Sequence, residues 1–342
     1  MTTSASPLPL ARAENSADGG ALPAIACGAL KQIASFGSLK KRLSILIYHR
    51  VLAQPDPLFP DEIDAVRFEQ QLRYLKANFN IISLADAVEG LRNDSLPPRA
   101  ACLTFDDGYA DNATIALPIL QRFGVHATVF VATGFIDGGR MWNDTIIELV
   151  RRSPATLDLS AAGYGVFTLD SVAARQAAIK SLLDQLKYIP MEERLRQVEA
   201  IAALSAVALP DDLMMSSAQV RQLHAAGIEI GAHTIDHPIL ARLPAAEARQ
   251  QIADGKAALE AMIGTPVNLF AYPNGKPGRD YLAEHVAMIE QLGFRAAVST
   301  SWGAARHGND LFQLPRFTPW DRARLPFTLR MLKNLRSRGD TV

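Results

Sequence analysis

The feature that most constrains the fold of this chain is a repeated order of an amphipathic helix, a glycine and a short apolar run. Three copies are clear: 117–123, Gly124 and 125–131; 217–226, Gly227 and 228–232; 281–292, Gly293 and 294–298. A glycine after the last helical turn can take the left-handed conformation that ends a helix. The apolar runs are too short for surface helices and suit strands buried on both faces. Helices alternating with such strands predict an α/β fold with a parallel sheet, open or closed into a barrel.

The ordered part of the chain is predicted to begin near residue 41. Residues 1–40 are rich in Ala, Ser, Pro and Gly without a sustained period, which is typical of a flexible arm. A strand-like run at 43–48 follows and ends at His49. Residues 68–79 then repeat the helical pattern before the apolar residues 80–82, without the glycine.

One long segment interrupts the alternation. Between about residues 138 and 215 no run is typical of a strand, and Ile179, Leu182 and Leu186 keep helical spacing. We interpret 138–215 as a helical insertion between two strands of the core. It serves either as a lid or cleft wall, or only as packing that supports the barrel.

The C-terminal segment, 322–342, combines basic and apolar residues. Its six basic residues surround apolar positions that include Phe327, Leu329 and Leu335. We expect a helix packed on the core with a solvated basic face, and the alternative is a helix on a membrane surface. The barrel itself is therefore assigned to residues 41–321.

Composition excludes several classes of partner. Thirty-five basic and thirty-five acidic residues cancel, so no global field favours nucleic acid. No apolar stretch approaches the length of a transmembrane segment, and residues 21–30 lack the basic start of a secretory signal. The sequence therefore predicts a soluble, cytoplasmic protein.

The two cysteines of the chain, Cys27 and Cys102, cannot form a disulfide framework, and Cys102 is expected to be a small buried hydrophobe.

Two adjacent carboxylates, Asp106 and Asp107, follow the predicted strand at 100–104. Loops at the carboxyl ends of strands carry the active site in parallel α/β folds. Adjacent residues at a strand end point in different directions, so one carboxylate can bind a metal while the other accepts a proton. A helix N-cap is the alternative interpretation of an Asp-Asp-Gly sequence.

Two histidines, His233 and His237, follow the predicted strand at 228–232. Pro238 prevents a regular helix there, but a single-turn loop could bring both rings to one point. Two imidazoles with one carboxylate favour a catalytic zinc-like site, because this set leaves coordination positions for water and substrate. Asp236 could orient one imidazole or could simply be a turn residue.

Two later strand ends provide further candidates. The segment Tyr272-Pro273-Asn274-Gly275 follows an apolar run and predicts a rigid turn whose backbone amides could face a ligand. Trp302 follows another run, and a sugar ring stacks well on an indole face. A tryptophan packed in the core is the alternative there.

The segments Thr104-Phe105-Asp106-Asp107-Gly108 and His233-Thr234-Ile235-Asp236-His237 strongly resemble motifs of the polysaccharide deacetylases, also called carbohydrate esterase family 4 or the NodB-type group. The resemblance covers roughly residues 43–320. It implies a distorted (β/α) barrel with the helical insertion placed within it. It also implies a divalent metal, usually Zn²⁺, and removal of N-acetyl groups from an amino sugar polymer or oligosaccharide.

The resemblance also implies roles for individual residues. Asp106 corresponds to the general base and Asp107 to the metal-binding carboxylate. The imidazole ligands correspond to His233 and His237. Tyr48-His49 resembles a subgroup linked to exopolysaccharide synthesis, which places His49 near the metal.

The third family motif, Arg-x-Pro-Tyr-Gly, corresponds to the turn at residues 271–275. The resemblance implies that Asn274 offers its backbone amide to the oxyanion. It also implies that Tyr272, Pro273 and Trp302 contact substrate.

The later motifs depart from the family pattern. The arginine that pairs with the base is replaced by Ala271, and the fourth motif lacks the aspartate that orients this arginine. Losing both avoids an unpaired buried charge. The fifth motif, Leu-x-His, ends in Arg316 instead of the histidine that acts as general acid. We hypothesise that Arg316 replaces the missing arginine and holds Asp106 ionised, which leaves His49 or Asp106 itself as the general acid.

The sequence thus predicts a metal-dependent deacetylase of N-acetylated amino sugars. A metal-dependent amidohydrolase of the same fold that acts on a non-sugar amide, such as a cyclic ureide, is one alternative. A non-catalytic carbohydrate-binding relative is the other. Sugar linkage, chain length and oligomeric state are not determined by the sequence.

Overall fold

The computed structural model describes residues 41–205 and 207–342, so the predicted arm at 1–40 lies outside the described residues. The strands are β1 (Arg42–Tyr48), β2 (Asn80–Ile81), β3 (Ala100–Phe105), β4 (Thr128–Val131), β5 (Thr156–Asp158), β6 (Val166–Thr168), β7 (Glu229–Ala232), β8 (Leu269–Ala271), β9 (Ala296–Val298) and β10 (Ala305–Arg306). The α-helices are α2 (Ala65–Asn78), α3 (Leu84–Arg92), α4 (Leu117–Phe123), α5 (Trp142–Arg152), α6 (Val172–Leu186), α7 (Met191–Leu204), α8 (Ser217–Ala225), α9 (Ala245–Ile263), α10 (Ala283–Gln291) and α11 (Arg324–Arg336).

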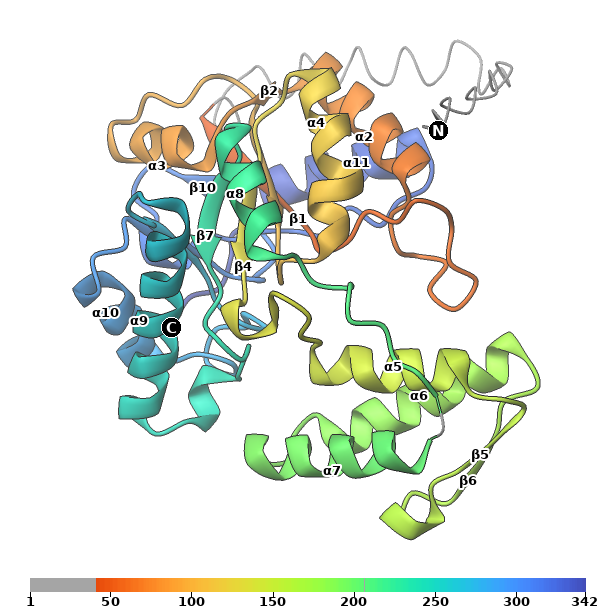
Figure 1. The fold of residues 1–342 in the computed structure, drawn as a ribbon. Coiled ribbons are helices and arrows are strands. Elements are labelled where there is room, and N and C mark those ends of the chain that lie inside the picture. The colour runs from red at the N-terminus through yellow and green to blue at the C-terminus, as the bar shows by residue number, and fades with distance from the viewer. Residues whose placement is uncertain (1–40, 206) are drawn as a thin grey trace, which may run out of the picture.

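The central sheet is mixed and mostly parallel. Its order is β10-β1-β3-β4-β7-β8-β9, with β2 paired to the start of β3. Only β10 runs antiparallel, against the start of β1. The other neighbours are parallel, so β1, β3, β4, β7, β8 and β9 all end at one edge of the sheet. Helices surround this half-barrel (Figure 1).

The extended residues 314–317 bridge the two ends of the strand order. Leu314 N–H donates to the Ala297 carbonyl of β9 at 2.9 Å. Phe317 N–H donates to the Ile45 carbonyl of β1 at 3.0 Å, and Ile47 N–H donates back to Phe317 at 3.0 Å. These bonds join β9 to β1 through one short segment. The predicted fold class, a distorted (β/α) barrel of the NodB type, is confirmed.

Alternate residues of the strands pack on opposite faces of the sheet. Ile45 and Cys102 belong to a cluster completed by α3, whereas Leu46 and Phe105 belong to the larger cluster under the outer helices. Burial on both faces explains why these strands are continuous apolar runs. The expectation that Cys102 is a buried hydrophobe is confirmed.

The predicted helix–glycine–strand units are present with shorter strands. Helix α4 ends at Phe123, and Gly124 follows with a left-handed φ of 58°. Strand β4 begins at Thr128, three residues later than the apolar run at 125–131 predicts. Residues 125–127 connect the helix to the strand and extend the apolar run without joining the sheet.

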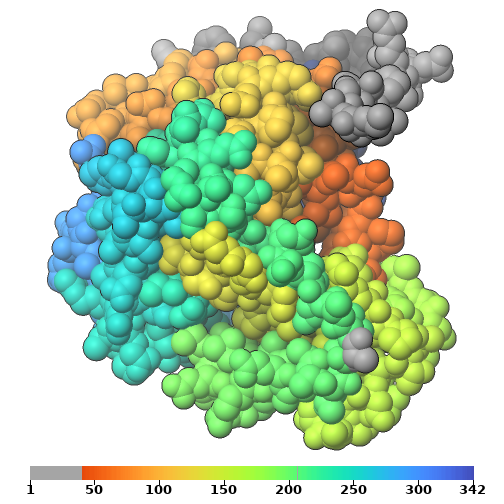
Figure 2. Space-filling view, viewed as in Figure 1, coloured from red at the N-terminus to blue at the C-terminus, as the bar shows by residue number. Residues whose placement is uncertain are grey.

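The segment between β4 and β7 is mainly helical, as predicted. Helices α5, α6 and α7 pack around their own core, in which Leu182 and Leu186 are fully buried. The hairpin of β5 and β6 was not predicted. Its strands have three residues each, which is too short to produce a recognisable period. Figures 1 and 2 show this segment as a lobe beside the barrel.

The C-terminal helix α11 packs on the barrel near the start of β1. Phe327, Met331 and Leu335 are buried, and the Ser44 hydroxyl donates to the Asn334 side chain at 2.9 Å. Leu329 instead lies on the exposed face beside the basic residues. Across residues 41–205 and 207–342, none of the helices combines the length and apolar character needed to cross a membrane.

Candidate active site

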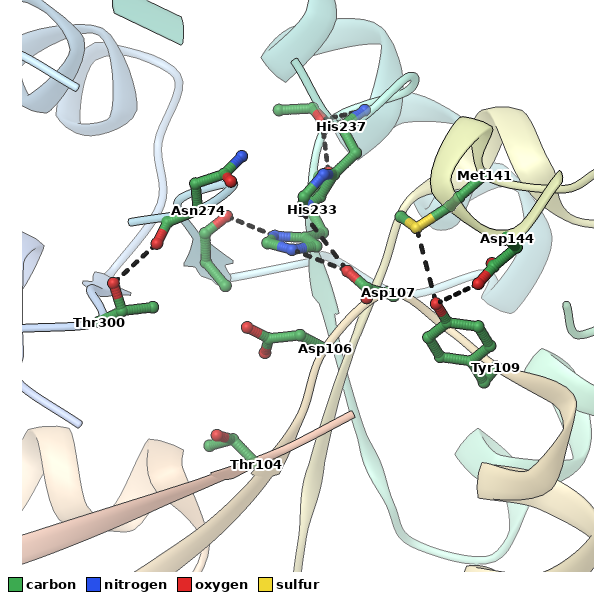
Figure 3. A network of polar contacts seen from close by, with 12 residues as sticks. Thr104, Asp106, Asp107, Tyr109, Met141, Asp144, His233, His237, Asn274 and Thr300 are labelled. Atoms are coloured by element: carbon green, nitrogen blue, oxygen red, sulfur yellow. Dashed lines mark hydrogen bonds and ion pairs between the residues drawn. The ribbon is translucent and has the colours of Figure 1, made fainter. Parts of the chain in front are cut away.

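The acidic pair lies in a tight turn directly after β3. Asp106 N–H donates to the Tyr48 carbonyl at 2.9 Å, which holds the turn against the end of β1. Asp107 has a left-handed φ of 75°, and Gly108 follows with a φ of 89°. This backbone path turns the two carboxylates apart (Figure 3). Asp106 faces Arg316, while Asp107 faces the two histidines.

The two histidines lie in a single-turn loop after β7. Thr234 and His237 have left-handed φ values of 66° and 51°, and His237 N–H donates to the Thr234 hydroxyl at 3.1 Å. The centroids of the His233 and His237 rings are 4.7 Å apart. The loop therefore brings both imidazoles to one point, as the sequence predicts.

Asp107 and the two imidazoles form a donor set that fits a metal ion. Asp107 Oδ1 lies 3.4 Å from His233 Nε2 and 3.5 Å from His237 Nε2. Two ligands about 2.1 Å from one tetrahedral ion would be separated by about 3.4 Å. Among the described residues, the buried Oδ1 has no hydrogen-bond partner. One carboxylate and two imidazoles are ligands that zinc accepts.

A backbone carbonyl sets the orientation of His233. Its Nδ1 lies 2.7 Å from the Ala271 carbonyl at the end of β8, so Nε2 faces Asp107. Asp236 does not orient an imidazole, because its carboxylate accepts a hydrogen bond from Gln251 at 2.7 Å. Of the two interpretations left open for Asp236, the structure therefore favours the turn residue.

Burial and neighbouring charges shift the pKa values of the three metal-ligand candidates. Burial opposes the charged form of Asp107, but His233 and His237 outweigh burial and lower the pKa of this carboxyl group. Burial also lowers the pKa of His237 to about 4. A metal binds the ionised carboxylate and the neutral imidazole, so these two shifts favour the binding forms. Burial also opposes the charged form of His233, but Asp107 and Asp106 outweigh burial and raise its pKa, so a metal there must displace a proton held more tightly.

Arg316 and Asp106 form a fully buried ion pair. Arg316 Nη1 and Nη2 donate to the two carboxylate oxygens of Asp106, each at 2.7 Å. Arg316 Nε donates to the Ser299 carbonyl at 2.9 Å, and Nη1 also donates to the Thr104 hydroxyl at 3.0 Å. Burial opposes ionisation of Asp106, but the charge and hydrogen bonds of Arg316 outweigh it and lower the pKa of Asp106. The geometry therefore places Arg316 where the hypothesis requires it.

Two parts of the site were not predicted from the sequence: the Thr104 hydroxyl and the Ala271 carbonyl. Thr104 ends the predicted strand and begins the first family motif, and no role was predicted for its side chain. Its hydroxyl accepts a hydrogen bond from Arg316 and donates to the Leu46 carbonyl at 2.9 Å. A polar residue in an otherwise apolar buried run is the signal that could have identified Thr104. The role of the Ala271 carbonyl leaves no signal in the sequence, because every residue has a backbone carbonyl.

His49 and Asn274 follow two other strands, β1 and β8, which end at the same edge of the sheet as β3 and β7. The His49 side chain is exposed, and the Asn112 amide donates to its carbonyl at 2.9 Å. Asn274 has a left-handed φ of 58°, and its carbonyl accepts a hydrogen bond from Thr300 at 2.7 Å. Within the described part of the chain, the backbone N–H of Asn274 has no acceptor.

Two of the expected substrate contacts are not part of this cluster. Tyr272 is fully buried and stacks on Tyr281 with a centroid distance of 3.9 Å. Strand alternation puts it with Phe270 in the core under the outer helices. The Tyr272 ring therefore packs in the core, and its predicted substrate contact remains a prediction. Pro273 is buried in the same turn, and its predicted contact remains a prediction.

Trp302 lies against the C-terminal helix instead of the metal donors. Its indole N–H donates to the Ser337 hydroxyl at 3.1 Å, and the ring borders a cavity of about 460 Å³ beside α11. The chain turns back after β9 to reach β10, which pairs with the start of β1, and this path carries Trp302 to α11. The ring therefore packs beside α11, and its predicted sugar contact remains a prediction.

Comparisons with known proteins agree with this geometry. Residues 93–297, more than half of the chain, match the family model for polysaccharide deacetylase. The protein YxkH of Bacillus subtilis (strain 168), which carries the same family name, is 23% identical over 277 residues, covering 80% of this chain and 70% of its own length.

Solved structures share the fold. Streptococcus pyogenes deacetylase PplD, in complex with acetate, has a TM-score of 0.57 at 18% identity, covering 86% of this chain and 99% of its own. IcaB from Ammonifex degensii has a TM-score of 0.56 at 19% identity, covering 87% and 98% respectively. The BpsB deacetylase domain from Bordetella bronchiseptica has a TM-score of 0.51 at 19% identity, covering 81% and 95%. At these identities the likeness establishes the fold alone. With the family match over residues 93–297, the chain belongs to the polysaccharide deacetylase family.

Proposed function

We propose that this protein is a metal-dependent hydrolase that removes N-acetyl groups from an amino sugar polymer or oligosaccharide. The observation that carries the proposal is the Asp107, His233 and His237 donor set beside a separately ion-paired carboxylate, Asp106. One carboxylate is thereby available for a metal and the other for a proton. Membership of the polysaccharide deacetylase family supports an acetylated sugar as substrate.

The donor set would hold the divalent ion, which we propose to be Zn²⁺. When bound, this ion would supply Lewis acidity that polarises the acetamide carbonyl and acidifies a water. Asp106, kept ionised by Arg316, accepts the proton of the attacking water. The free N–H of Asn274 donates to the oxyanion that develops on the carbonyl oxygen. Proton delivery to the leaving amine then gives acetate and a free amino sugar.

His49 is the proton donor that we propose for the leaving amine. The fifth-motif position holds Arg316, which is already committed to Asp106. His49 is exposed at the end of β1, and its charge helps to lower the pKa of both Asp106 and Asp107. His49 directly follows Tyr48, whose carbonyl accepts the Asp106 N–H, so it stands beside the turn that carries the acidic pair. Asp106 passing on the proton that it has accepted is the alternative.

His49→Gln is expected to separate proton donation from the rest of catalysis. An amide needs a proton on its leaving nitrogen, and a general acid contributes about 10²–10⁴-fold to the rate. The variant should lose about that factor on N-acetylated sugars. It should keep most activity on 4-nitrophenyl acetate, whose phenolate leaves without a proton. Equal losses on both substrates would argue against His49 as the acid.

Release of acetate tests the proposed function directly. Purified protein is incubated with chitin oligosaccharides, β-1,6-linked N-acetylglucosamine polymer and a cyclic ureide, with and without added zinc. We expect acetate from at least one sugar, loss of that activity with a chelator, and recovery when zinc is restored. Hydrolysis of the ureide alone would support the other amidohydrolase class.

The predicted cytoplasmic location remains a separate prediction, which cell fractionation can test.

A further inference from the structure

The helical insertion is joined to the turn that carries Asp107. Just before α8, the chain leaving the insertion pairs with this turn: Ala110 N–H donates to the Leu213 carbonyl at 2.8 Å, and Met215 N–H donates to the Gly108 carbonyl at 3.0 Å. Near the entry to the insertion, Ala132 N–H donates to the Asp107 carbonyl at 3.2 Å. Both ends of the insertion therefore meet the turn after β3.

One side chain of this turn reaches into the insertion. The Tyr109 hydroxyl donates to Asp144 Oδ1 at 3.2 Å, and Asp144 lies in the first turn of α5 (Figure 3). Tyr109 and Asp144 are only 4% and 5% exposed. The Tyr109 ring also packs with Met141 and Met214, which lie near the two ends of the insertion.

Arg50, which follows the end of β1, also covers the Tyr109 ring. The Arg50 guanidinium carbon lies 4.8 Å from the ring centroid. Arg50 is itself held by Asp111, which accepts its Nε hydrogen at 2.8 Å. Tyr109 is therefore fixed between the end of β1 and the start of the insertion.

The turn needs such support because its backbone is strained. A left-handed conformation at a residue other than glycine costs about 1–3 kcal/mol and persists only where the surroundings enforce it. Asp107, with its φ of 75°, is such a residue and provides the proposed metal carboxylate. A side chain at Gly108 would add strain, because its φ is 89° and a Cβ there would lie 3.0 Å from Val131 Cγ1.

We propose that Tyr109 and Asp144 are positioning residues, whose hydrogen bond holds the turn so that Asp107 faces His233 and His237. The helical insertion would then have a function that neither a lid nor simple packing describes: it sets the metal-binding carboxylate from outside the barrel. This inference rests on the proposed function, because it assumes that Asp107 binds a metal. Positions that orient a metal ligand typically contribute about 10–100-fold to metal affinity.

Two variants of Asp144 distinguish loss of its carboxyl group from loss of its hydrogen-bond acceptor. Burial raises the pKa of Asp144 to about 7, against the opposing effect of Arg50, with Asp107 and Glu148 adding to the rise. Asparagine has the same shape and keeps the oxygen that accepts the Tyr109 hydrogen. Asp144→Asn is therefore the conservative variant, and Asp144→Ala is the variant that removes the acceptor.

The matched control is Tyr164→Phe. Tyr164 also lies in the insertion, and its hydroxyl donates to the Gln197 side chain far from the metal donors in sequence. The two Tyr→Phe changes remove the same atom, but only the change at Tyr109 removes a bond to the turn. Any general effect of losing a phenolic hydroxyl will appear in both variants.

Zinc affinity of the full-length chain is the measurement. Each metal-free variant is titrated with Zn²⁺ against a chromogenic chelator at fixed pH, and Tm is recorded without metal. We expect Tyr109→Phe and Asp144→Ala to weaken zinc binding by about 10–100-fold. Asp144→Asn and Tyr164→Phe should stay within about threefold of wild type. The double variant Tyr109→Phe/Asp144→Ala should be no weaker than the weaker single variant, since both remove one hydrogen bond.

The possible results separate the inference from the proposed function. If wild type binds zinc and Tyr109→Phe and Asp144→Ala bind it equally well, the positioning role is wrong. A lowered Tm with unchanged zinc affinity would also overturn it, because that result describes a purely structural bond. If wild type binds no zinc, the proposed function fails and the inference fails with it. Recovery of kcat in Tyr109→Phe at saturating zinc, with KM unchanged, would further support positioning of the metal ligand.

Discussion

Asp106→Asn is expected to bind zinc as wild type does and to lose about 10²–10⁴-fold in turnover. The amide cannot accept the proton of the attacking water, while Asp107, His233 and His237 remain in place. Zinc content after dialysis and the rate of acetate release measure the two effects separately. Because the change leaves Arg316 without its carboxylate, folding is checked by circular dichroism and Tm.

His233→Ala is the matched contrast to Asp106→Asn. It removes a ring nitrogen that lies 3.4 Å from Asp107 Oδ1, so both zinc and turnover should be lost. Zinc retained at full occupancy in His233→Ala would show that the ligand assignment is wrong. Zinc lost in Asp106→Asn would show that the two adjacent carboxylates do not divide their roles as proposed.

Arg316→Met is expected to destabilise the protein by about 3–5 kcal/mol, since removing one partner of a buried ion pair leaves the other charge uncompensated. Asp106 is 2% exposed and both of its carboxylate oxygens bond Arg316, so solvent cannot replace the lost partner. Urea denaturation of chelator-treated protein measures the change in the free energy of unfolding. The double variant Arg316→Met/Asp106→Asn should recover much of this stability and none of the activity. Equal destabilisation in the single and double variants would contradict this explanation.

The pH dependence of Arg316→Met follows from the sign of the pKa shift. In wild type the pKa of Asp106 is lowered, so its contribution to stability is present above the unfolded pKa and is lost as pH falls through the folded pKa. Without Arg316, burial dominates and the pKa of Asp106 rises above its unfolded value. The stability gap between wild type and variant should therefore shrink on acidification. The acid limb of the rate profile should move to higher pH, since Asp106 acts as a base only when ionised.

Local pattern was sufficient to predict most of the barrel. Buried strands between amphipathic helices leave a period that a single sequence reveals, and Gly124 ends its helix as predicted. The hairpin of β5 and β6 was missed because its strands are three residues long. The sequence also did not predict that residues 314–317 join β9 to β1. That role depends on where the two strands lie in the folded barrel.

Candidate site residues were predictable where the side chain itself carries the chemistry. Asp107, His233 and His237 are ligand types at strand ends, and parallel strands bring those ends together. Tyr272 and Trp302 were assigned to substrate because aromatic rings suit sugars as well as cores. The tertiary structure decides which neighbours these rings meet: Tyr272 stacks on Tyr281, and Trp302 donates to the Ser337 hydroxyl.

The sequence by itself determined the class of fold and the donor set, because hydrophobic period and side-chain chemistry are local properties. Only the tertiary structure decided which groups meet. It placed Arg316 on Asp106 across 210 residues of chain, aimed His233 with the Ala271 carbonyl and joined Tyr109 to Asp144 of the insertion. These contacts depend on distances between segments far apart in the chain. Residue types alone do not specify such distances, and packing of the whole barrel fixes them.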